Sequence, residues 1–336
     1  MISFLQLKYV IVTTAMLIVL RLNTITAQTV NGITNVPDTT FNLRNEFEKV
    51  KKQYPAISIP ADERSAFIAE QRNIRYYKPA NRFLKLDAFF PKQNKGYIKK
   101  TPAIIIIHGG GWRSGNKGQH HTLAFNLAAK GYACFTPEYR LSTEALYPAA
   151  VQDVKAAVKW IKTNATKFHV DTNRIVVLGF SAGGQLAALV GTTINDQTLE
   201  PSFTAKASSK VHAIVDIDGI LSFIHPESGE GDDSKKISAA THWFGYSKTE
   251  KPELWKQASP LTYAGASTPP TLFINSSVAR MHAGRNDFMQ LLRNNNIYTE
   301  VKEFENSPHS FCLFEPWFTP TVEAIDTFLQ NVFPKK

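Results

Sequence analysis

The chain has 336 residues, of which 43% are hydrophobic and 20% charged. This composition excludes a disordered chain, and the absence of a fixed-period repeat excludes a repeat architecture. A sheet-based enzyme fold accommodates such a length as one main domain. The net charge of +10 suits an anionic partner, but no Lys/Arg cluster is long enough to predict nucleic-acid binding, and a generally basic solvated surface is the alternative. Two cysteines, Cys134 and Cys312, are too few for a disulfide scaffold, and we expect two inert thiols.

An apolar run over residues 9–20 follows Lys8 and precedes Ile25-Thr26-Ala27. The run is too short for a spanning helix and is followed by a small residue, so residues 1–27 are predicted to be a signal peptide cleaved near Ala27. Because Arg21 is untypical so close to a cleavage site, an uncleaved anchor is the alternative. No later stretch is apolar and long enough to span a bilayer. We therefore expect an exported protein, periplasmic or secreted, without stable membrane insertion after cleavage.

Residues 28–70 are polar and mixed, with a short helix predicted around residues 47–50. We interpret them as an N-terminal extension that packs on a catalytic domain formed by residues 71–336. Two strands are predicted next, over residues 74–78 and 83–90. The second alternates apolar and polar residues, as a half-exposed antiparallel strand does.

Four consecutive isoleucines in residues 103–107 predict a strand that is buried on both faces of a parallel sheet. Strands and helices then alternate: strands at 132–137, 174–179, 211–217, 271–275 and 298–304, and helices at 147–163, 182–190 and 321–332. This order predicts an α/β fold with a mostly parallel, doubly wound sheet of about eight strands, flanked by helices. Residues 221–259 are too many for a simple connection and are predicted to form a small cap.

The run Gly179-Phe180-Ser181-Ala182-Gly183 follows a predicted strand and opens a predicted helix. In that context G-x-S-x-G indicates a nucleophile elbow, whereas a structural strand-to-helix turn is the plainer alternative. The glycines permit a tight turn, and Ser181 stands at a helix N-terminus, where developing negative charge is favoured. Ser181 is therefore the candidate nucleophile.

The run His108-Gly109-Gly110-Gly111-Trp112 lies at the carboxyl end of the isoleucine strand. Glycines leave backbone N–H groups free to point into a site, as an oxyanion hole requires. We assign the donors to Gly110, Gly111 and Ala182, and we expect His108 to buttress the loop. Phosphate-binding fingerprints are absent from this run.

His309 lies in Ser307-Pro308-His309-Ser310, after the last predicted strand and before the C-terminal helix. The order of the sheet would bring this loop over Ser181. A serine hydroxyl needs such a base to become nucleophilic, and the same imidazole then protonates the leaving group. A structural histidine is the alternative.

Together with Tyr139-Arg140-Leu141 and Tyr147-Pro148-Ala149-Ala150, these runs resemble the hormone-sensitive-lipase-like group of α/β-hydrolases. The resemblance is closest to bacterial acetyl-xylan and feruloyl esterase-like enzymes. It is strong over about residues 82–192 and partial from residue 259 onward. It implies an α/β-hydrolase fold, a Ser–His–carboxylate triad, no metal or other cofactor, and hydrolysis of esters, often acyl groups on plant polysaccharides.

The sequence departs from this group where the acid is expected, because residues 275–280 contain no aspartate. Asp218, directly after the strand predicted at 211–217, resembles the acid of lipases that carry it one strand earlier. Asp287 has the more familiar chain position, but the first turn of a helix is also where a plain capping acid stands. Both candidates remain open, as does the absence of any acid.

Arg280, His282 and Arg285 crowd the loop that would normally hold the acid. Guanidinium groups suit bidentate carboxylate recognition, so these residues are candidates for binding a uronic-acid substrate, with ordinary surface charge as the alternative. Trp112, Trp243 and Trp317 are candidate sugar-stacking residues, or else packing residues.

The sequence therefore predicts an exported serine carboxylesterase that hydrolyses ester-linked acyl groups, acetyl in particular, on a polysaccharide or oligosaccharide. The alternatives are a peptidase or a lipase of the same fold. A catalytically impaired carbohydrate-binding homologue is a third alternative, because the usual acid is missing.

Overall fold

The structure is a computed structural model that describes residues 32–61, 65–93, 99–194, 196–202 and 207–334. The predicted signal peptide lies outside the described residues. No helix in the described part of the chain combines the length and apolar character needed to cross a membrane.

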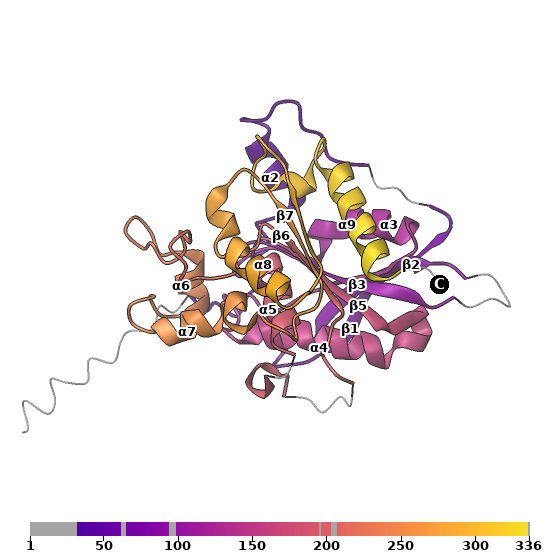
Figure 1. Cartoon of the computed structure of the whole chain (residues 1–336), viewed down its shortest axis with the longest axis horizontal. Helices are drawn as coiled ribbons and strands as arrows, with labels where there is room; N and C mark the ends of the chain where they lie inside the picture. The colour runs from indigo at the N-terminus through magenta and orange to yellow at the C-terminus, as the bar shows by residue number, and fades with distance from the viewer. Residues whose placement is uncertain (1–31, 62–64, 94–98, 195, 203–206, 335–336) are drawn as a thin grey trace, which may run out of the picture. The chain divides into compact units, whose positions relative to one another are not determined.

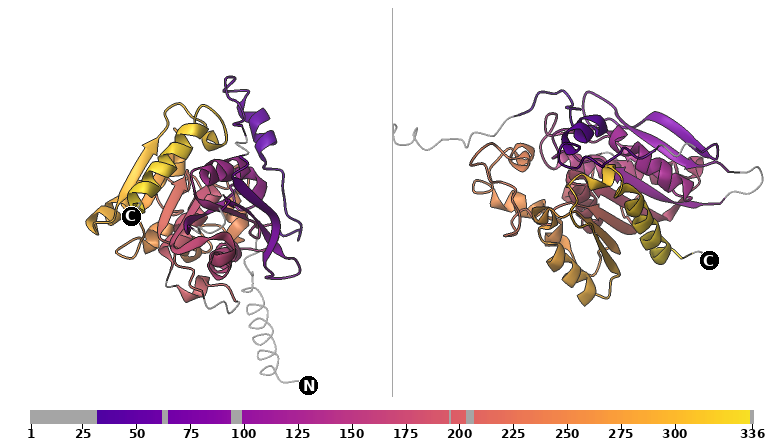
Figure 2. Two further views of the ribbon diagram at one scale, coloured as in Figure 1. Left: turned by 90° about the vertical axis from the view of Figure 1, so that its right-hand side faces the viewer. Right: turned by 90° about the horizontal axis from the view of Figure 1, so that it is seen from above.

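The described residues form one eight-stranded sheet in the order β1-β2-β4-β3-β5-β6-β7-β8. β1 and β2 are antiparallel, as are β2 and β4, and the remaining pairs are parallel. The two outer strands β1 and β2 (purple) lie at one edge and β8 (yellow) at the other (Figure 2). The predicted mostly parallel α/β sheet is confirmed. The strands are β1 (Ile68–Tyr77), β2 (Leu84–Pro91), β3 (Thr101–Ile107), β4 (Ala133–Pro137), β5 (Val170–Phe180), β6 (Ala213–Ile217), β7 (Thr271–Asn275) and β8 (Thr299–Glu303).

Helices cover both faces of the sheet, with α3 and α9 above the central strands in Figure 1 and α4 and α5 below them. Because parallel strands need crossover connections, successive strands from β3 onward are joined by helical segments. The helices are α2 (Leu43–Val50), α3 (His121–Ala129), α4 (Ala149–Thr163), α5 (Ala182–Thr192), α6 (Ala239–Phe244), α7 (Pro252–Gln257), α8 (Arg285–Asn294) and α9 (Phe318–Val332).

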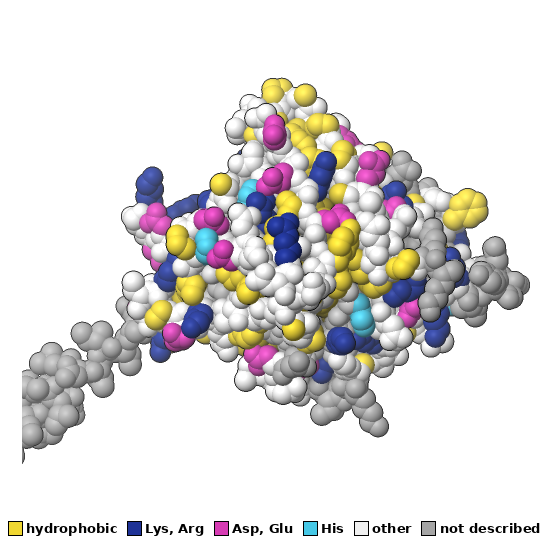
Figure 3. Space-filling view, in the orientation of Figure 1, with side chains coloured by type: hydrophobic (Ala, Val, Ile, Leu, Met, Phe, Trp, Pro, Cys, Tyr) yellow, Lys and Arg dark blue, Asp and Glu magenta, His cyan; other side chains and the backbone are white. Residues whose placement is uncertain are grey.

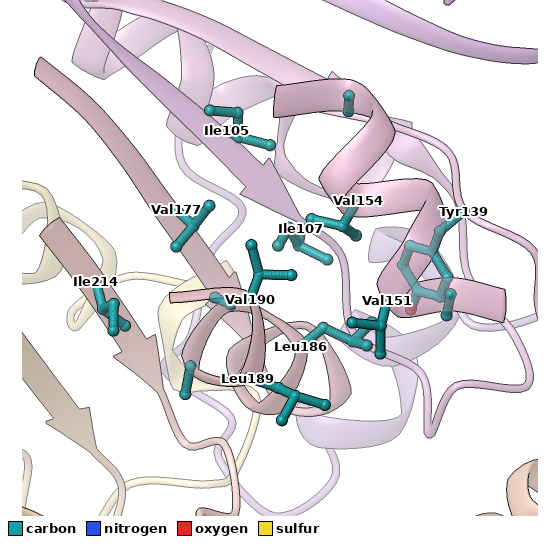
Figure 4. Packing of buried hydrophobic residues seen from close by; sticks show 14 of the residues in the cluster. Ile105, Ile107, Tyr139, Val151, Val154, Val177, Leu186, Leu189, Val190 and Ile214 are labelled. Atoms are coloured by element: carbon teal, nitrogen blue, oxygen red, sulfur yellow. The ribbon is translucent and has the colours of Figure 1, made fainter. Parts of the chain in front are cut away.

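The isoleucine run of β3 divides between two hydrophobic cores. Ile105 and Ile107 belong to the core that includes α4 and α5, and Ile104 and Ile106 belong to the core that includes α3 and α9. Figure 4 shows the first core, in which residues of β3 and β5 face Val151, Val154, Leu186 and Leu189. Successive side chains of a strand point to opposite faces, so a strand covered on both sides needs apolar residues throughout.

The predicted cap segment contains α6 and α7, which lie together at the left of Figure 1. Their contact is aromatic, with the rings of Phe244 and Trp255 only 4.5 Å apart. Phe223, at the start of the segment, packs on both rings. Within the predicted N-terminal extension, α2 packs on the second core through Val50 and Phe47.

Most element boundaries differ from those predicted by a few residues, and two of these differences have a clear physical reason. β1 begins at Ile68, inside the predicted extension, and not at residue 74. It is an edge strand with two register shifts against β2, so its buried positions do not alternate regularly. The last helix begins at Phe318 and not at residue 321. Pro320 lies in its first turn, where a residue without an N–H is tolerated.

Lys and Arg side chains are spread among acidic and neutral ones on the face shown in Figure 3, and the described residues there form no continuous basic patch. Cys134 and Cys312 are both buried free thiols. Burial raises the pKa of each thiol, which opposes formation of the reactive thiolate.

Candidate active site

Ser181 lies between the end of β5 and the start of α5, in a backbone conformation that is unusual for a residue with a side chain (φ 57°, ψ −122°). The chain reverses here so tightly that a Cβ at Gly183 would come within 2.2 Å of the carbonyl oxygen of Ile107. The Ser181 N–H donates to the Ile217 carbonyl on β6, which ties the turn to the next strand. Strain of this kind concentrates at functional sites, because the surrounding structure must hold it.

His309 lies in the loop between β8 and α9, and its Nε2 is 2.8 Å from Ser181 Oγ. Its Nδ1 is 2.9 Å from Asp218 Oδ2. A carboxylate can only accept, so Nδ1 carries the proton and donates it to Asp218, and the Nε2 lone pair is left to accept from the Ser181 hydroxyl. The ring also packs against Phe180 at 4.9 Å, which limits its rotation.

Asp218 directly follows β6 and adopts a left-handed conformation (φ 50°) that aims its fully buried side chain at His309. Ser276, after β7, donates to it twice, from its N–H at 2.8 Å and from its hydroxyl at 2.5 Å. Burial raises the pKa of this carboxyl, but the neighbouring His282 ring and the hydrogen bonds from His309 and Ser276 outweigh burial and lower the pKa to about 2. Asp218 is therefore ionised at neutral pH.

Asp287, the other candidate acid, lies elsewhere. It stands in the first turn of α8 with a side chain that is 64% exposed, and its Oδ2 is 3.4 Å from His225 Nε2. The structure therefore brings Asp218 to His309 and leaves Asp287 as an acidic residue near a helix N-terminus.

The glycine loop after β3 turns sharply toward the site. Gly110 has a φ of +121°, and a Cβ there would come within 2.0 Å of the Ser114 carbonyl oxygen. Gly111 and Ala182 both line the cavity that contains Ser181. The backbone amides of residues 111 and 182 thus lie at the cavity that contains the nucleophile, one in a loop and one at a helix N-terminus, and Gly110 directly precedes Gly111.

His108 holds this loop from behind. Its Nδ1–H donates to the Gly109 carbonyl oxygen at 2.9 Å, and its ring stacks on Tyr139 at 4.3 Å. The Tyr139 hydroxyl donates back to the His108 carbonyl oxygen at 3.0 Å. Burial lowers the pKa of His108 to about 4, so the ring is neutral at neutral pH and suited to support rather than to proton transfer.

Trp112 is the last residue of the glycine motif and is 3% exposed. Its indole N–H donates to Gln185 at 2.9 Å, and the Gln185 amide donates to the Ala258 carbonyl oxygen at 2.8 Å. The ring stacks on Trp243 at 4.9 Å. The glycine loop is thereby joined to α5 and to the end of the cap segment.

A cavity of about 190 Å³ opens over Ser181. Its lining comes from the glycine loop, the elbow, the cap segment and the loop after β7: Gly111, Trp112, Ser181, Ala182, Ile220, Glu230, Ala239, Arg280, Met281 and His309. No group of three or more His, Cys, Asp or Glu residues within the described ranges could hold a metal ion. The chemistry available here is that of a serine, a histidine and a carboxylate.

The candidate substrate-binding residues differ in their contacts with the catalytic cavity. Trp112 and Arg280 line the cavity, whereas Arg285 bonds Glu303 at 2.5 Å and the Asn275 side chain at 2.8 Å. His282 turns toward the acid, with its Nε2 3.5 Å from Asp218 Oδ1. Arg280, His282 and Arg285 also all line a second pocket, of about 250 Å³, together with Glu227, Ala279 and Asn286.

The other two tryptophans do not reach the cavity. Trp243 is fully buried beneath Trp112, and Trp317 packs edge-on against Tyr54, 5.7 Å away. Both are packing residues, because large aromatic side chains supply much of a core's apolar area.

Several residues that support the site carried no signal in the sequence analysis. Ser276 and Gln185 are polar residues whose hydrogen-bond partners lie 58 and 73 residues away in the sequence. Asp216 accepts the Gly219 N–H at 2.8 Å and so shapes the turn after Asp218. Glu230 enters the cavity from an irregular segment. Only the position of Ser276, directly after a strand at the catalytic edge of the sheet, could have pointed to it.

Comparisons with known proteins agree with this geometry. The BD-FAE family model matches residues 86–280. Esterase LipC of Mycobacterium tuberculosis is 29% identical over 292 residues, which cover 82% of this chain and 71% of LipC. The probable carboxylic ester hydrolase LipM of the same organism is 29% identical over 69% of this chain, which spans 55% of LipM.

A similar fold occurs in a solved structure described as a truncated form of carbohydrate esterase from gut microbiota. That structure superimposes with a TM-score of 0.63 at 24% identity, over 82% of this chain and 100% of the other.

The fold, the arrangement of serine, histidine and aspartate, and these relatives define the class as serine hydrolases of carboxylic esters, in the hormone-sensitive-lipase-like group of α/β-hydrolases. Within that class, the chain belongs to the BD-FAE family.

Proposed function

We propose that the protein is a carboxylesterase that removes short acyl groups, acetyl in particular, from a carbohydrate through an acyl-enzyme on Ser181. The observation that carries this proposal is the hydrogen-bonded chain from Asp218 through His309 to Ser181, which ends at a small cavity. Nucleophile, base and orienting carboxylate are each within bonding distance of the next.

The reaction begins when Ser181 Oγ attacks the ester carbonyl carbon. His309 Nε2 takes the hydroxyl proton, and Asp218 stabilises the resulting imidazolium by accepting the Nδ1–H bond. The carbonyl oxygen becomes an oxyanion, which the amides of Gly110, Gly111 and Ala182 are positioned to stabilise. One such donor is worth about 10²–10³ in kcat in a known serine protease.

The tetrahedral intermediate collapses when its bond to the alcohol oxygen breaks. His309 Nε2–H protonates that oxygen, the alcohol leaves, and the acyl group stays on Ser181. Water then attacks the acyl carbon as His309 takes its proton, and the second collapse returns that proton to Ser181 and releases the acid.

The size of the cavity supports a short acyl group. About 190 Å³ is less than the roughly 300–1,000 Å³ of pockets that enclose drug-sized ligands. Trp112, Ile220 and Met281 give it apolar walls, which suit a methyl group better than a long chain that would need more room. A lipase with a long acyl chain is less compatible with this volume.

The carbohydrate part of the proposal rests on the resemblance to acetyl-xylan and feruloyl esterase-like enzymes and on the predicted export, and a solved structure of similar fold is described as a carbohydrate esterase. The intact hydrogen-bonded chain speaks against a catalytically impaired binding protein, because an acid does contact His309. A peptidase of this fold remains the second candidate, since the same nucleophile can attack an amide.

The test compares wild type, Ser181→Ala and Ser181→Cys on 4-nitrophenyl acetate, a 4-nitrophenyl octanoate and an acetylated xylo-oligosaccharide. Wild type should release acetate from both acetyl esters and favour acetate over octanoate, and Ser181→Ala should lose at least about 10³-fold in kcat. Equal turnover by wild type and Ser181→Ala would refute the proposal. Faster cleavage of a peptide than of every ester would favour the peptidase.

The export prediction is carried forward as part of this proposal. Expression of the full chain with its first 27 residues should give a mature protein that begins at Gln28, outside the cytoplasm, as read by N-terminal sequencing. A chain retained in membranes with Met1 intact would favour the anchor.

A further inference from the structure

Glu230 and Arg280 line the catalytic cavity but take no part in the proton relay. Glu230 comes from the cap segment, ahead of α6, and Arg280 from the 3₁₀ turn after β7 (Ala279–His282). The apolar side chains of the lining are those of Trp112, Ala182, Ile220, Ala239 and Met281. The polar part of any ester bound here must therefore meet these two charged groups or solvent.

The Glu230 carboxylate is held well inside the cavity. Its side chain is only 16% exposed, and the backbone N–H of Ala240 donates to it. Burial raises its pKa, whereas the nearby charge of Arg280 opposes that rise. A carboxylate with this little solvent is costly unless it has partners, so a ligand that donates to it gains from doing so.

Arg280 forms only a loose pair with this carboxylate. Its Nη1 is 3.4 Å from Glu230 Oε1, and its side chain is 54% exposed. A guanidinium has five N–H donors in a fixed plane, so donors remain for a ligand at the mouth of the cavity. Within this cavity the charges of the two side chains sum to zero, so the cavity carries no net charge that would attract an anionic or a cationic ligand.

The Glu230 carboxylate can only accept hydrogen bonds, and the Arg280 guanidinium can only donate them. Together they match ligand groups that both donate and accept. Adjacent hydroxyls of a neutral sugar are such groups, because each O–H donates and each oxygen accepts. In this cavity a uronate would meet the Glu230 carboxylate, whereas Arg285 lines a second pocket and already donates to Glu303, Asn275 and Asn286. An aliphatic alcohol would add no hydrogen bond to either charged group.

We propose that Glu230 and Arg280 form the alcohol subsite and select esters of neutral, polyhydroxylated alcohols over aliphatic and uronic-acid esters. This inference rests on the proposed esterase function and names the leaving group on which it acts. The subsite works by matching hydroxyl donors and acceptors, not by attracting charge.

The experiment measures kcat/KM of the full protein on an acetylated neutral xylo-oligosaccharide, an acetylated galacturonic-acid oligosaccharide and butyl acetate. The variants are Glu230→Met, Glu230→Gln and Arg280→Met. Glu323→Met and Arg293→Met serve as matched controls, because these side chains are exposed on α9 and α8. Thermal unfolding checks that each variant is folded.

Wild type should prefer the neutral sugar acetate to both other esters. Glu230→Met and Arg280→Met should lower the ratio of kcat/KM for the neutral sugar over butyl acetate at least tenfold. Glu230→Gln should lower it by only about threefold, because the amide retains a carbonyl acceptor of the same shape. Both controls should keep the wild-type ratio.

Equal losses on the sugar ester and on butyl acetate would overturn the subsite and leave the esterase proposal standing. A wild-type preference for the uronate ester that Arg280→Met abolishes would overturn it in favour of anion recognition. Failure of wild type to hydrolyse any of the three esters, or 4-nitrophenyl acetate, would instead refute the esterase function on which the subsite depends.

Discussion

Asp218 Oδ2 accepts a hydrogen bond from His309 Nδ1 at 2.9 Å, across 91 residues of chain. The contact joins the end of β6 to the loop after β8, over the intervening strand β7. Ser276, at the end of β7, bonds the same carboxylate, so the middle strand supports the contact that spans it.

Replacement of Asp218 by Asn should lower kcat on 4-nitrophenyl acetate by about 10³–10⁴, as loss of the orienting carboxylate does in serine proteases. The amide can present an N–H to His309 and favour the wrong tautomer. Asp287→Asn, the matched control, should stay within about twofold because Asp287 is exposed and bonded to His225. A hundredfold loss in Asp287→Asn alone would contradict this assignment.

The low pKa of Asp218, about 2, makes a prediction for stability against pH. A carboxyl whose pKa is depressed by folding stabilises the protein above its unfolded pKa of about 3.9 and loses that contribution as the pH falls through the folded value. Wild type should therefore exceed Asp218→Asn in free energy of unfolding by about 2 kcal/mol more at pH 6 than at pH 2, in urea titrations. A difference that does not change over this range would show that Asp218 is not stabilised in its ionised form.

Gln185→Met should destabilise the protein by about 2–4 kcal/mol, because it leaves the Trp112 indole N–H and the Ala258 carbonyl oxygen buried without partners. Urea unfolding measures the loss. Gln290→Met, on the exposed side of α8, should change stability by less than about 0.5 kcal/mol. Similar losses in the two variants would mean that the link from the glycine loop to the cap contributes nothing.

Ile105→Ala should lower the free energy of unfolding by about 2–5 kcal/mol, since Ile105 on β3 is fully buried against the helices of the first core (Figure 4). Ile59→Ala is the control, because Ile59 is 44% exposed and should lose under about 1 kcal/mol. Equal shifts of the urea midpoint in the two variants would argue against a close-packed core at β3.

The central strands and their catalytic loops could be predicted because the residues that they require are adjacent in the sequence. Burial on both faces requires the isoleucine run of β3, and the tight turn requires glycine beside Ser181. β1 could be predicted only in part, because an edge strand with bulges has no regular alternation. The α3 helix was not predicted, although it packs on the second core.

The choice of the acid could not be made from the sequence. Asp218 and Asp287 differ in the direction in which the backbone points the side chain. The left-handed conformation of Asp218 is accompanied by hydrogen bonds with Ile274, Ser276 and His309, which lie far away in the sequence. Glu230 was missed for a related reason, since it lies in an irregular segment without periodicity. Such positions depend on tertiary packing.

Because the acid directly follows β6, two neighbouring loops have different functions. The turn after β6 supplies the carboxylate that contacts His309. The segment after β7 does not have to supply it and instead places Arg280 and Met281 in the cavity. Under the proposed subsite, we expect changes at residue 280 to alter the preferred alcohol and changes at residue 281 to alter the preferred acyl group, while the relay keeps its geometry. Directed evolution of new substrate preferences could therefore begin with a library confined to residues 280 and 281.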